Sequence, residues 1–394
     1  MCLIFSLIHL LLNNNHNMKI GLLTYYGDLN CGTNMQALST FNALKSVYPN
    51  DVVEIIPFHG FRARMMPYKT FSPVNIWNDI KRFKKYADFK KNKLQVRQDV
   101  IIKDVDDALR YIASRKYDVI YVGADTLLEL DKLLPGYDGI SAYWLKDIKA
   151  KKVLIAASSK NVTYEKLSVK QQADLKVAAS QFSYIGVRDR ATMALFEHLV
   201  DKNKKIEYIP DPTFTFDIDY SYIDAYLKKK GVVIPEKSVF VQFYGDDYWL
   251  ADVAKDLKQR GYTLITNRGV AWSDIVLIDM SPLEQIGLYR YVSFVITHRF
   301  HDGVFCMKNH TPALIYVKSA KIMMTGGESK HVSLLKDFGL YPQAFLGALD
   351  SKEGLKNVWQ SYEETMRVFD EDKVEEVLLK NKKVYLDYLN STLK

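Results

Sequence analysis

Apolar runs alternate with helical patterns along most of this 394-residue chain. The first run is KIGLLTY (19–25), and the segment TNMQALSTFNALKSVY after it has apolar residues at helical spacing. Five further apolar runs in the first half, mostly separated by helical patterns, lie at 52–58, 117–125, 151–159, 183–189 and 206–212. Near-continuous apolar strands separated by helices predict a parallel sheet that is covered on both faces.

The same alternation starts again in the second half. A lysine-rich stretch, AYLKKKGVVIPEK (225–237), reads as a linker. Beyond it, apolar runs at 238–244, 262–267, 274–280, 293–299 and 312–317 predict a second sheet of the same kind. We therefore expect an α/β protein with two Rossmann-like domains facing a cleft. The predicted segments are an N-terminal domain at 18–230, a C-terminal domain at 231–350 and a helical tail at 351–394.

The first 17 residues differ in character from the rest of the chain. Their apolar run of about ten residues is too short to span a bilayer. They have neither a basic n-region nor a small-residue cleavage site, so they make a poor signal peptide. Because MKIGLLTYY at Met18 reads as a fresh start, we expect 1–17 to be an extension without fixed structure. A short membrane-contacting segment is the alternative.

Composition narrows the class of protein. With 54 basic and 46 acidic residues the net charge is +8, and much of the excess lies in KRFKKYADFKKNKLQVRQ (81–98), which has a helical pattern. This run is either a solvated helix face or a patch that attracts anionic lipid or a nucleotide-linked substrate. No nucleic-acid-binding signature accompanies it, so we expect no nucleic-acid partner. The three cysteines, Cys2, Cys31 and Cys306, suggest no disulfide framework and favour a cytoplasmic protein.

Polar and charged residues stand directly after many of the predicted strands. In open parallel sheets, ligands bind beyond the carboxyl ends of the strands. The repeated coincidence predicts an enzyme or a small-ligand binder. The residues at such positions are Asn30, Gly32, Asp125, Ser158, Arg188 and Asp211, together with the cluster THRFH at 297–301.

The THRFH cluster is the strongest of these. If the chain stays extended past Thr297, Arg299 and His301 point to the same side, and a short helix begins near Asp302. A guanidinium beside a helix start suits a phosphate or carboxylate, and a histidine there can exchange a proton near neutral pH. The alternative is structural: Arg299 pairs with an acidic neighbour and His301 caps the helix.

Four more residues carry two interpretations each. Arg188 is either a second anion-binding group or half of a surface pair with Asp189. Asp125 and Asp211 either hold turns or orient sugar hydroxyls. Lys321 either reaches a bound anion or is solvated.

Several chemistries are disfavoured. The loop YGDLNCGTN matches neither the dinucleotide-binding nor the Walker pattern, so we predict no nicotinamide or ATPase site. The two histidines of THRFH lack a nearby third ligand, and we expect no metal. Cys31 is a nucleophile candidate by position only, and a structural role is expected for it.

The ordered set of motifs resembles the polysaccharide pyruvyl transferases. The matching segments are GDLNCGTNMQAL, VGAD, AASS, VRD, PDPT and the long block SPLEQIGLYRYVSFVITHRFHDGVFCMKNHTPALIYV, within about residues 19–325. The resemblance implies a GT-B-like fold and transfer of a pyruvyl group from phosphoenolpyruvate to a sugar, usually as a cyclic ketal. It implies no cofactor besides phosphoenolpyruvate as the donor substrate.

The resemblance also implies roles for individual residues. His301 would handle the proton, aided by Arg299. The donor-binding residues would be Arg188, Arg299, Phe300, His301 and Lys321. The acceptor-binding residues would be Asp125, Asp211, Asn30 and Gly32, on the N-terminal domain. The acceptor sugar would be nucleotide-linked, lipid-linked or part of an oligosaccharide, and peripheral contact with the inner face of the membrane is compatible with the basic 81–98 run.

Two other functions remain open from the sequence. One is a GT-B-type glycosyltransferase that uses a nucleotide-sugar, for which Glu328 in MTGGESK could bind the ribose. The other is a non-catalytic sugar-binding protein of the same pathway.

Overall fold

The computed structural model describes residues 17–58, 75–97, 99, 100, 102, 104–130, 139–160, 162–243, 249–320, 329–351 and 354–393. The expected extension at 1–17, apart from Asn17, lies outside the described residues. So do Lys321 and Glu328.

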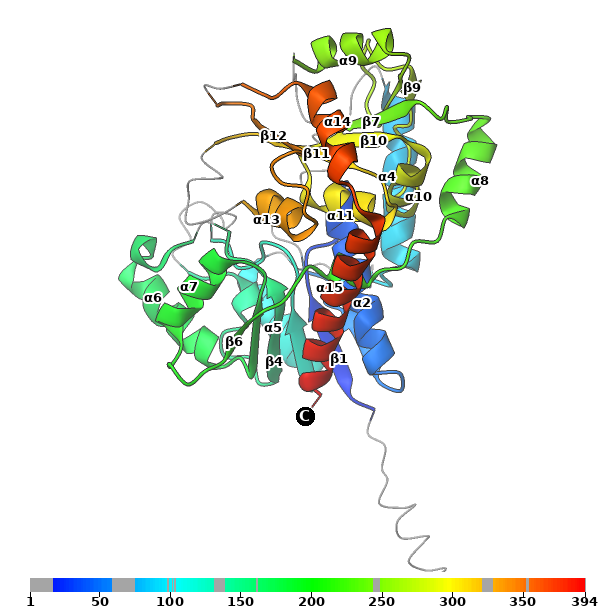
Figure 1. Cartoon of the computed structure of the whole chain (residues 1–394). Helices are drawn as coiled ribbons and strands as arrows, with labels where there is room; N and C mark the ends of the chain where they lie inside the picture. The colour runs from blue at the N-terminus through cyan, green and yellow to red at the C-terminus, as the bar shows by residue number, and fades with distance from the viewer. Residues whose placement is uncertain are drawn as a thin grey trace, which may run out of the picture.

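Two six-stranded parallel sheets form the frame of the molecule (Figure 1). The first has the order β2-β1-β3-β4-β5-β6, with every neighbouring pair parallel. Its strands are β1 (Lys19–Leu23), β2 (Val52–Ile55), β3 (Val119–Val122), β4 (Lys151–Ala157), β5 (Tyr184–Val187) and β6 (Ile206–Tyr208). The second has the order β12-β11-β10-β7-β8-β9, again parallel throughout. Its strands are β7 (Ser238–Gln242), β8 (Thr263–Thr266), β9 (Ile275–Val276), β10 (Phe294–Thr297), β11 (Ala313–Val317) and β12 (Phe345–Ala348).

The central strands are buried along their whole length, which is why they appear in the sequence as unbroken apolar runs. Helices cover the sheets as the alternating pattern predicts, so the expected α/β fold with two sheets is confirmed. The helices of the first half are α2 (Cys31–Val47), α4 (Ile76–Asn92), α5 (Val105–Arg115), η3 (Ala142–Trp144), η4 (Tyr164–Lys166), α6 (Val169–Ser180), α7 (Arg190–Leu199), η5 (Pro212–Thr215) and α8 (Ser221–Lys230). Those of the second half are α9 (Trp249–Gln259), α10 (Pro282–Leu288), η6 (Tyr289–Tyr291), α11 (Phe300–Lys308), α13 (Lys330–Asp337), α14 (Val358–Val368) and α15 (Glu371–Ser391).

The two halves share one buried core. Helix α2 packs against α10 and α11 of the second half, and the apolar cluster around it contains strand residues from both sheets, such as Leu22 and Val241. The C-terminal helix α15 returns from the second half and packs on η5, α2 and α11 (Figure 1). Its Tyr388 hydroxyl donates to the Leu154 carbonyl of β4 at 2.8 Å. The tail is therefore a structural part of both halves.

Three details differ from the sequence prediction. The expected linker at 225–237 is helical as far as Lys230, because Ile223, Tyr226 and Leu227 bury one face of α8, which packs on α10. The expected strand at 274–280 pairs only over Ile275–Val276, because it lies at the sheet edge with a single neighbour. Strand β12 was not predicted, because it is short and contains a glycine.

None of the helices in the described ranges is long and apolar enough to cross a bilayer.

We predict that Leu389→Ala on α15 lowers the free energy of unfolding by about 2–5 kcal/mol, because Leu389 is fully buried in the shared core. Leu379→Ala on the same helix is the matched control. Since Leu379 is 57% exposed, that change should cost less than about 0.5 kcal/mol. Urea unfolding of both variants checks this, and equal effects would contradict the packing of α15.

Candidate functional site

The loop after β1 connects the two halves through one side-chain oxygen. Asn30 is the N-cap of α2, where its Oδ1 accepts from the Gly32 N–H at 3.1 Å. The same oxygen accepts from Arg299 Nη1 of the second half at 2.8 Å. Asn30 therefore starts a helix and fixes the position of a guanidinium.

Gly32 lies directly against His301. A Cβ at Gly32 would be 2.3 Å from His301 Nδ1 and 2.8 Å from His301 Cβ, well inside van der Waals contact. Glycine is required at this position so that the first turn of α2 can approach the imidazole. The two predicted residues are thus brought together across the interface between the halves.

Helix α11 begins two residues earlier than expected. Arg299 is its N-cap in an extended conformation, and the helix starts at Phe300. The buried Asp302 carboxylate explains this, because it accepts from the hydroxyls of Thr297 at 2.9 Å and Tyr289 at 2.9 Å and so draws the chain into a turn. The expectation that Arg299 and His301 alternate as in a strand was therefore wrong. Both nevertheless reach the interface, from the N-cap and the first turn of α11.

Asp211 is the centre of the site. It is 1% exposed, and its Oδ2 accepts from Arg188 Nη1 at 2.7 Å and from Gln36 Nε2 at 2.7 Å. His301 Nε2 lies 3.4 Å from the same oxygen, an ion-pair distance whose direction does not make a hydrogen bond. Asp211 Oδ1 caps η5 by accepting from the Thr213 N–H and hydroxyl. One carboxylate thus holds groups from α2, β5 and α11.

Asp125 is the second acidic group at the site. It comes just after β3 with φ at +85°, a strained conformation for a residue with a side chain. Its Oδ1 accepts from the Thr126 N–H at 2.8 Å and lies 3.4 Å from Arg188 Nη2. Arg188 therefore lies between two carboxylates and is not a surface partner of Asp189. Asp189 instead caps α7.

Electrostatics keep both aspartates ionised. Burial alone would raise the pKa of Asp211, but His301 and Arg188 outweigh it and hold the pKa well below its usual range. Burial likewise opposes ionisation of Asp125, and the charges of Arg188 and Lys330 lower its pKa below the usual value. The site therefore places the ionised carboxylates of Asp211 and Asp125 next to the positive charges of Arg188 and Lys330.

Phe300 supports the cations around it. Arg188 lies with its guanidinium carbon 5.8 Å from the centre of the Phe300 ring, and Lys330 Nζ lies 5.2 Å from it. The surrounding protein and the Arg188 charge lower the pKa of Lys330, although the residue remains exposed to solvent. Lys330 is the first residue of α13, after the cap Ser329. The sequence analysis did not identify Lys330, because a lysine that opens a helix has no distinguishing pattern.

Two further histidines flank the site. Burial lowers the pKa of both His298 and His331 to about 3, so each is neutral near pH 7. His331 Nε2 lies 3.1 Å from the His298 carbonyl oxygen, and Phe300 packs against the His331 ring edge. Both rings pack against aromatic side chains, His331 against Phe300 and His298 against Tyr316.

Cys31 is buried beside the site. Its thiol donates to the Pro282 carbonyl at 3.5 Å, and burial raises its pKa above the usual value, so the thiolate is disfavoured. This agrees with the structural role expected for it. Gln36 and Thr213, which complete the shell of Asp211, were also missed: Gln36 lies inside a helix, and Thr213 was quoted only as part of the motif PDPT.

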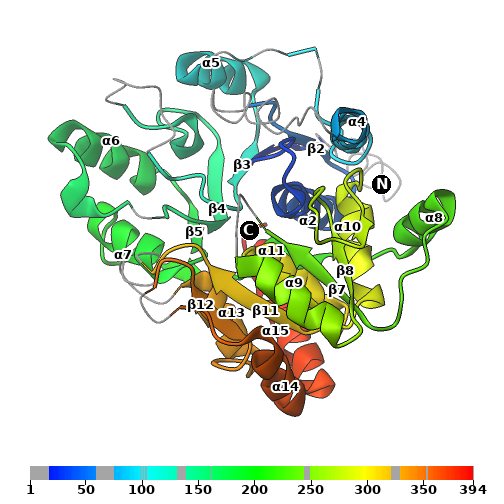
Figure 2. The ribbon, with the colours of Figure 1, turned by 90° about the horizontal axis from the view of Figure 1, so that it is seen from above.

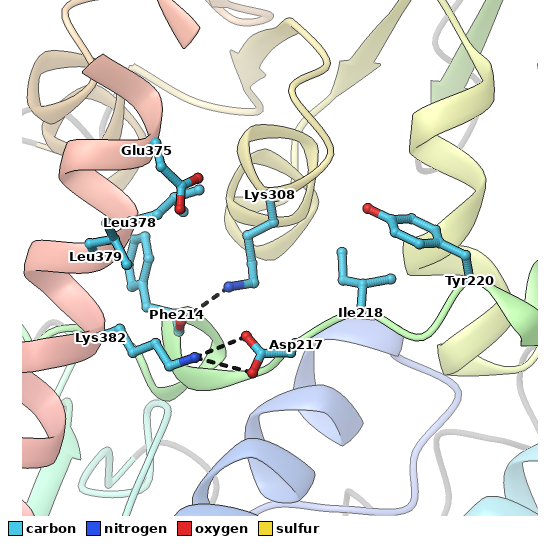
Figure 3. Close-up of a pocket in the computed structure, with 9 residues that line it drawn as sticks. All are labelled: Phe214, Asp217, Ile218, Tyr220, Lys308, Glu375, Leu378, Leu379 and Lys382. Carbon is cyan, nitrogen blue, oxygen red and sulfur yellow. Dashed lines mark hydrogen bonds and ion pairs between the residues drawn. The ribbon is translucent and has the colours of Figure 1, made fainter. Parts of the chain in front are cut away.

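A separate surface hollow of about 200 Å³ lies between η5, α11 and α15 (Figure 3). Lys308 reaches into it from the C-terminal end of α11 and donates to the Phe214 carbonyl at 3.1 Å, while Lys382 pairs with Asp217. Burial lowers the pKa of Lys308 to about 8. Because His301 is at the opposite end of α11, this hollow is distinct from the predicted site.

Comparison with solved structures supports the fold. The chain resembles the UDP-GlcNAc 2-epimerase from Neisseria meningitidis bound to UDP-GlcNAc, with 9% identity, a TM-score of 0.53 and coverage of 94% of this chain and 99% of that one. It also resembles a putative UDP-N-acetylglucosamine 2-epimerase from Listeria monocytogenes, with 8% identity, a TM-score of 0.52 and coverage of 93% and 92%. At such identities the likeness shows a shared GT-B-like fold and nothing about the ligand.

Comparison at the level of sequence identifies the family. No curated protein sequence matches the chain. The model of the family described as polysaccharide pyruvyl transferase matches residues 30–317, a range that begins at the cap of α2 and ends with β11. This range contains the buried charge cluster and most of both sheets, and the chain belongs to the polysaccharide pyruvyl transferase family.

Proposed function

We propose that this protein transfers a pyruvyl group from phosphoenolpyruvate to a sugar of a cell-surface polysaccharide or its precursor, forming a ketal. The observation that carries the proposal is the convergence of Arg188, Arg299 and His301 on the interface between the two sheets, organised by Asp211. Membership of the family supports the reaction class.

The donor carries a phosphate and a carboxylate, and the cations of the site suit both. Arg299 is held by Asn30 at the start of α11, where the free N–H groups of the first helical turn also favour an anion. Arg188 has donors left beyond the two that face Asp211 and Asp125. Lys330, which also lies against the Phe300 ring, adds a third cation. In this account Lys330 has the role that the sequence resemblance gave to Lys321.

His301 is the acid in this mechanism. It protonates the methylene carbon of phosphoenolpyruvate, which leaves a cation-like centre at the neighbouring carbon. A sugar hydroxyl adds there and gives up its proton to a base. The bond to phosphate then breaks, the cations stabilise the departing group, and a second hydroxyl of the same sugar closes the ketal. Phosphoenolpyruvate and a diol are thereby converted to a ketal and inorganic phosphate.

Asp211 acts on the reaction through other groups. It is too buried to meet a sugar, and its oxygens already accept from Arg188, Gln36 and Thr213. Its role is to orient the His301 ring and to balance its charge when the ring is protonated. Asp125 is more exposed, and its carboxylate is the better candidate to accept a hydrogen bond from the acceptor sugar.

Donor binding should depend strongly on Arg299. We expect Arg299→Ala to weaken phosphoenolpyruvate binding roughly 10- to 100-fold, because a charge-assisted contact is lost. Calorimetric titration measures this. Arg97→Ala, which removes an exposed arginine paired with Asp99, is the matched control and should leave binding unchanged.

The same titration with a nucleoside diphosphate separates this function from a nucleotide-sugar glycosyltransferase. Tight nucleotide binding by the wild-type protein without phosphoenolpyruvate binding would contradict the proposal.

We expect His301→Gln to retain most donor binding while turnover falls roughly 10²- to 10⁴-fold, because only the proton transfer is lost.

Gly32→Ala should damage catalysis more than stability. The added Cβ would overlap the His301 ring and displace it from Asp211. We expect turnover to fall roughly 100-fold, in line with the sensitivity of catalysis to misplacement of about 1 Å. Asn42→Ala, at an exposed position of the same helix, should have no such effect. Unchanged turnover in Gly32→Ala would show that the contact with His301 has no catalytic role.

Asp211→Asn should produce a pH-dependent loss of stability. The pKa of Asp211 is lowered in the folded state, so its contribution is complete above pH of about 4 and is lost as the pH falls below that. At pH 7 the variant should be less stable by about 3–5 kcal/mol, because Arg188 and His301 lose a buried partner. The difference from wild type should shrink towards pH 3 in urea unfolding.

Asp217→Asn serves as the control for that experiment. The Asp217 side chain is exposed and pairs only with Lys382 among the interactions of the described residues, so its loss should cost less than about 1 kcal/mol. A gap between Asp211→Asn and wild type that stays constant from pH 7 to pH 3 would contradict the account.

A further inference from the structure

Helix α4 is attached to the protein by a largely polar face. Arg82 Nη2 donates to the Leu29 carbonyl at 2.9 Å. Lys85 Nζ donates to both oxygens of Glu284, at 2.9 and 2.7 Å, and lies 4.3 Å from the centre of the Tyr226 ring. Only Tyr86 and Phe89 of this helix are buried. Figure 2 shows α4 at the periphery of the molecule, next to α10.

The outward face of α4 is apolar, which reverses the usual pattern of a surface helix. Trp77 is 75% exposed, Ile76 is 44%, Ile80 is 45% and Phe83 is 37%. Their spacing along the sequence places these four side chains on one side of the helix. Elsewhere, strongly exposed apolar side chains such as Val169 and Val233 have no equally exposed apolar residue next to them in the sequence, which is normal for a globular protein.

Exposed lysines lie within and beside this face. The helix contains six basic and two acidic residues. Lys81, Lys84 and Lys91 are exposed, and Lys84 lies between Trp77 and Phe83 in the helical projection. A helix face that combines tryptophan and isoleucine with lysines is typical of helices that lie in a membrane interface.

We propose that the outward face of α4, defined by Ile76, Trp77 and Ile80 with Lys81 and Lys84, docks on an anionic membrane surface. The apolar side chains enter the boundary between headgroups and acyl chains, and the lysines contact anionic headgroups. A second copy of the chain is a poorer partner, because the positive charges of Lys81 and Lys84 on the two copies would repel each other.

The position of α4 relates membrane docking to the proposed reaction. Arg82 contacts the Leu29 carbonyl, one residue before Asn30, which holds Arg299. A membrane in contact with the outward face of α4 is therefore separated from the loop that organises the site only by the width of this helix. Resting on the function proposed above, this implies that the acceptor sugar is lipid-linked and is presented from the membrane surface.

Co-sedimentation with vesicles tests the docking without donor or acceptor, so its result is independent of the proposed reaction. We expect the full chain to bind vesicles of phosphatidylglycerol and phosphatidylcholine and to bind pure phosphatidylcholine far more weakly. The variant Trp77→Ser/Ile80→Ser should bind the anionic vesicles at least about tenfold more weakly. Lys81→Glu/Lys84→Glu should lose a comparable factor or more, because about fivefold is expected for each charge removed.

Matched controls are available on other elements. Val169→Ser/Val233→Ser removes two apolar side chains that are more exposed than Trp77 and Ile80, and Lys228→Glu/Lys229→Glu reverses two exposed charges on α8; both should bind like wild type. The free energy of unfolding in urea should be within about 1 kcal/mol of wild type in all the α4 variants, which shows that they are folded. Wild-type protein that does not bind anionic vesicles, or α4 variants that bind as well as wild type, would overturn the proposal.

Discussion

The ionised carboxylate of Asp211, buried where the two halves meet, is the interaction on which the site depends. A charge without access to water must be compensated by partners, or the fold loses several kcal/mol. Here the partners come from three places in the chain: Gln36 on α2, Arg188 after β5 and His301 on α11. Satisfying one buried charge therefore fixes the relative position of the sheets and orients the groups that would act on substrate.

Residues at the N-termini of helices provide many of the side chains around this charge. Asn30 caps α2 and holds Arg299, Arg299 caps α11, and Asp211 caps η5. The contacts of Asn30 with Arg299 and of Asp211 with His301 hold the three helix starts close together. Such an arrangement gathers N–H groups and positive dipole ends around an anion. The close approach of Gly32 to His301 then brings α2 and α11 into van der Waals contact.

The sequence predicted the fold well because both sheets are parallel and buried. Their strands are unbroken apolar runs, which are the strongest pattern a sequence offers. It also singled out most residues that meet in the buried charge cluster, for a related reason: polar groups at the ends of such strands are conspicuous. Thr297 and Asp302, by contrast, change a strand end into a helix start through side-chain hydrogen bonds, and the expected alternation of Arg299 and His301 failed there. Lys330 and Gln36 reach the site only through tertiary packing, which no local pattern encodes.

The most direct test of the proposed chemistry is the origin of the methyl hydrogen in the product. With phosphoenolpyruvate and an acceptor sugar in deuterium oxide, protonation of the methylene carbon predicts one solvent deuterium in the methyl group of the ketal, with one phosphate released for each ketal. Mass spectrometry of the product measures this. A product whose transferred group contains no solvent deuterium, or one that forms with release of a nucleoside diphosphate in place of phosphate, would contradict the account.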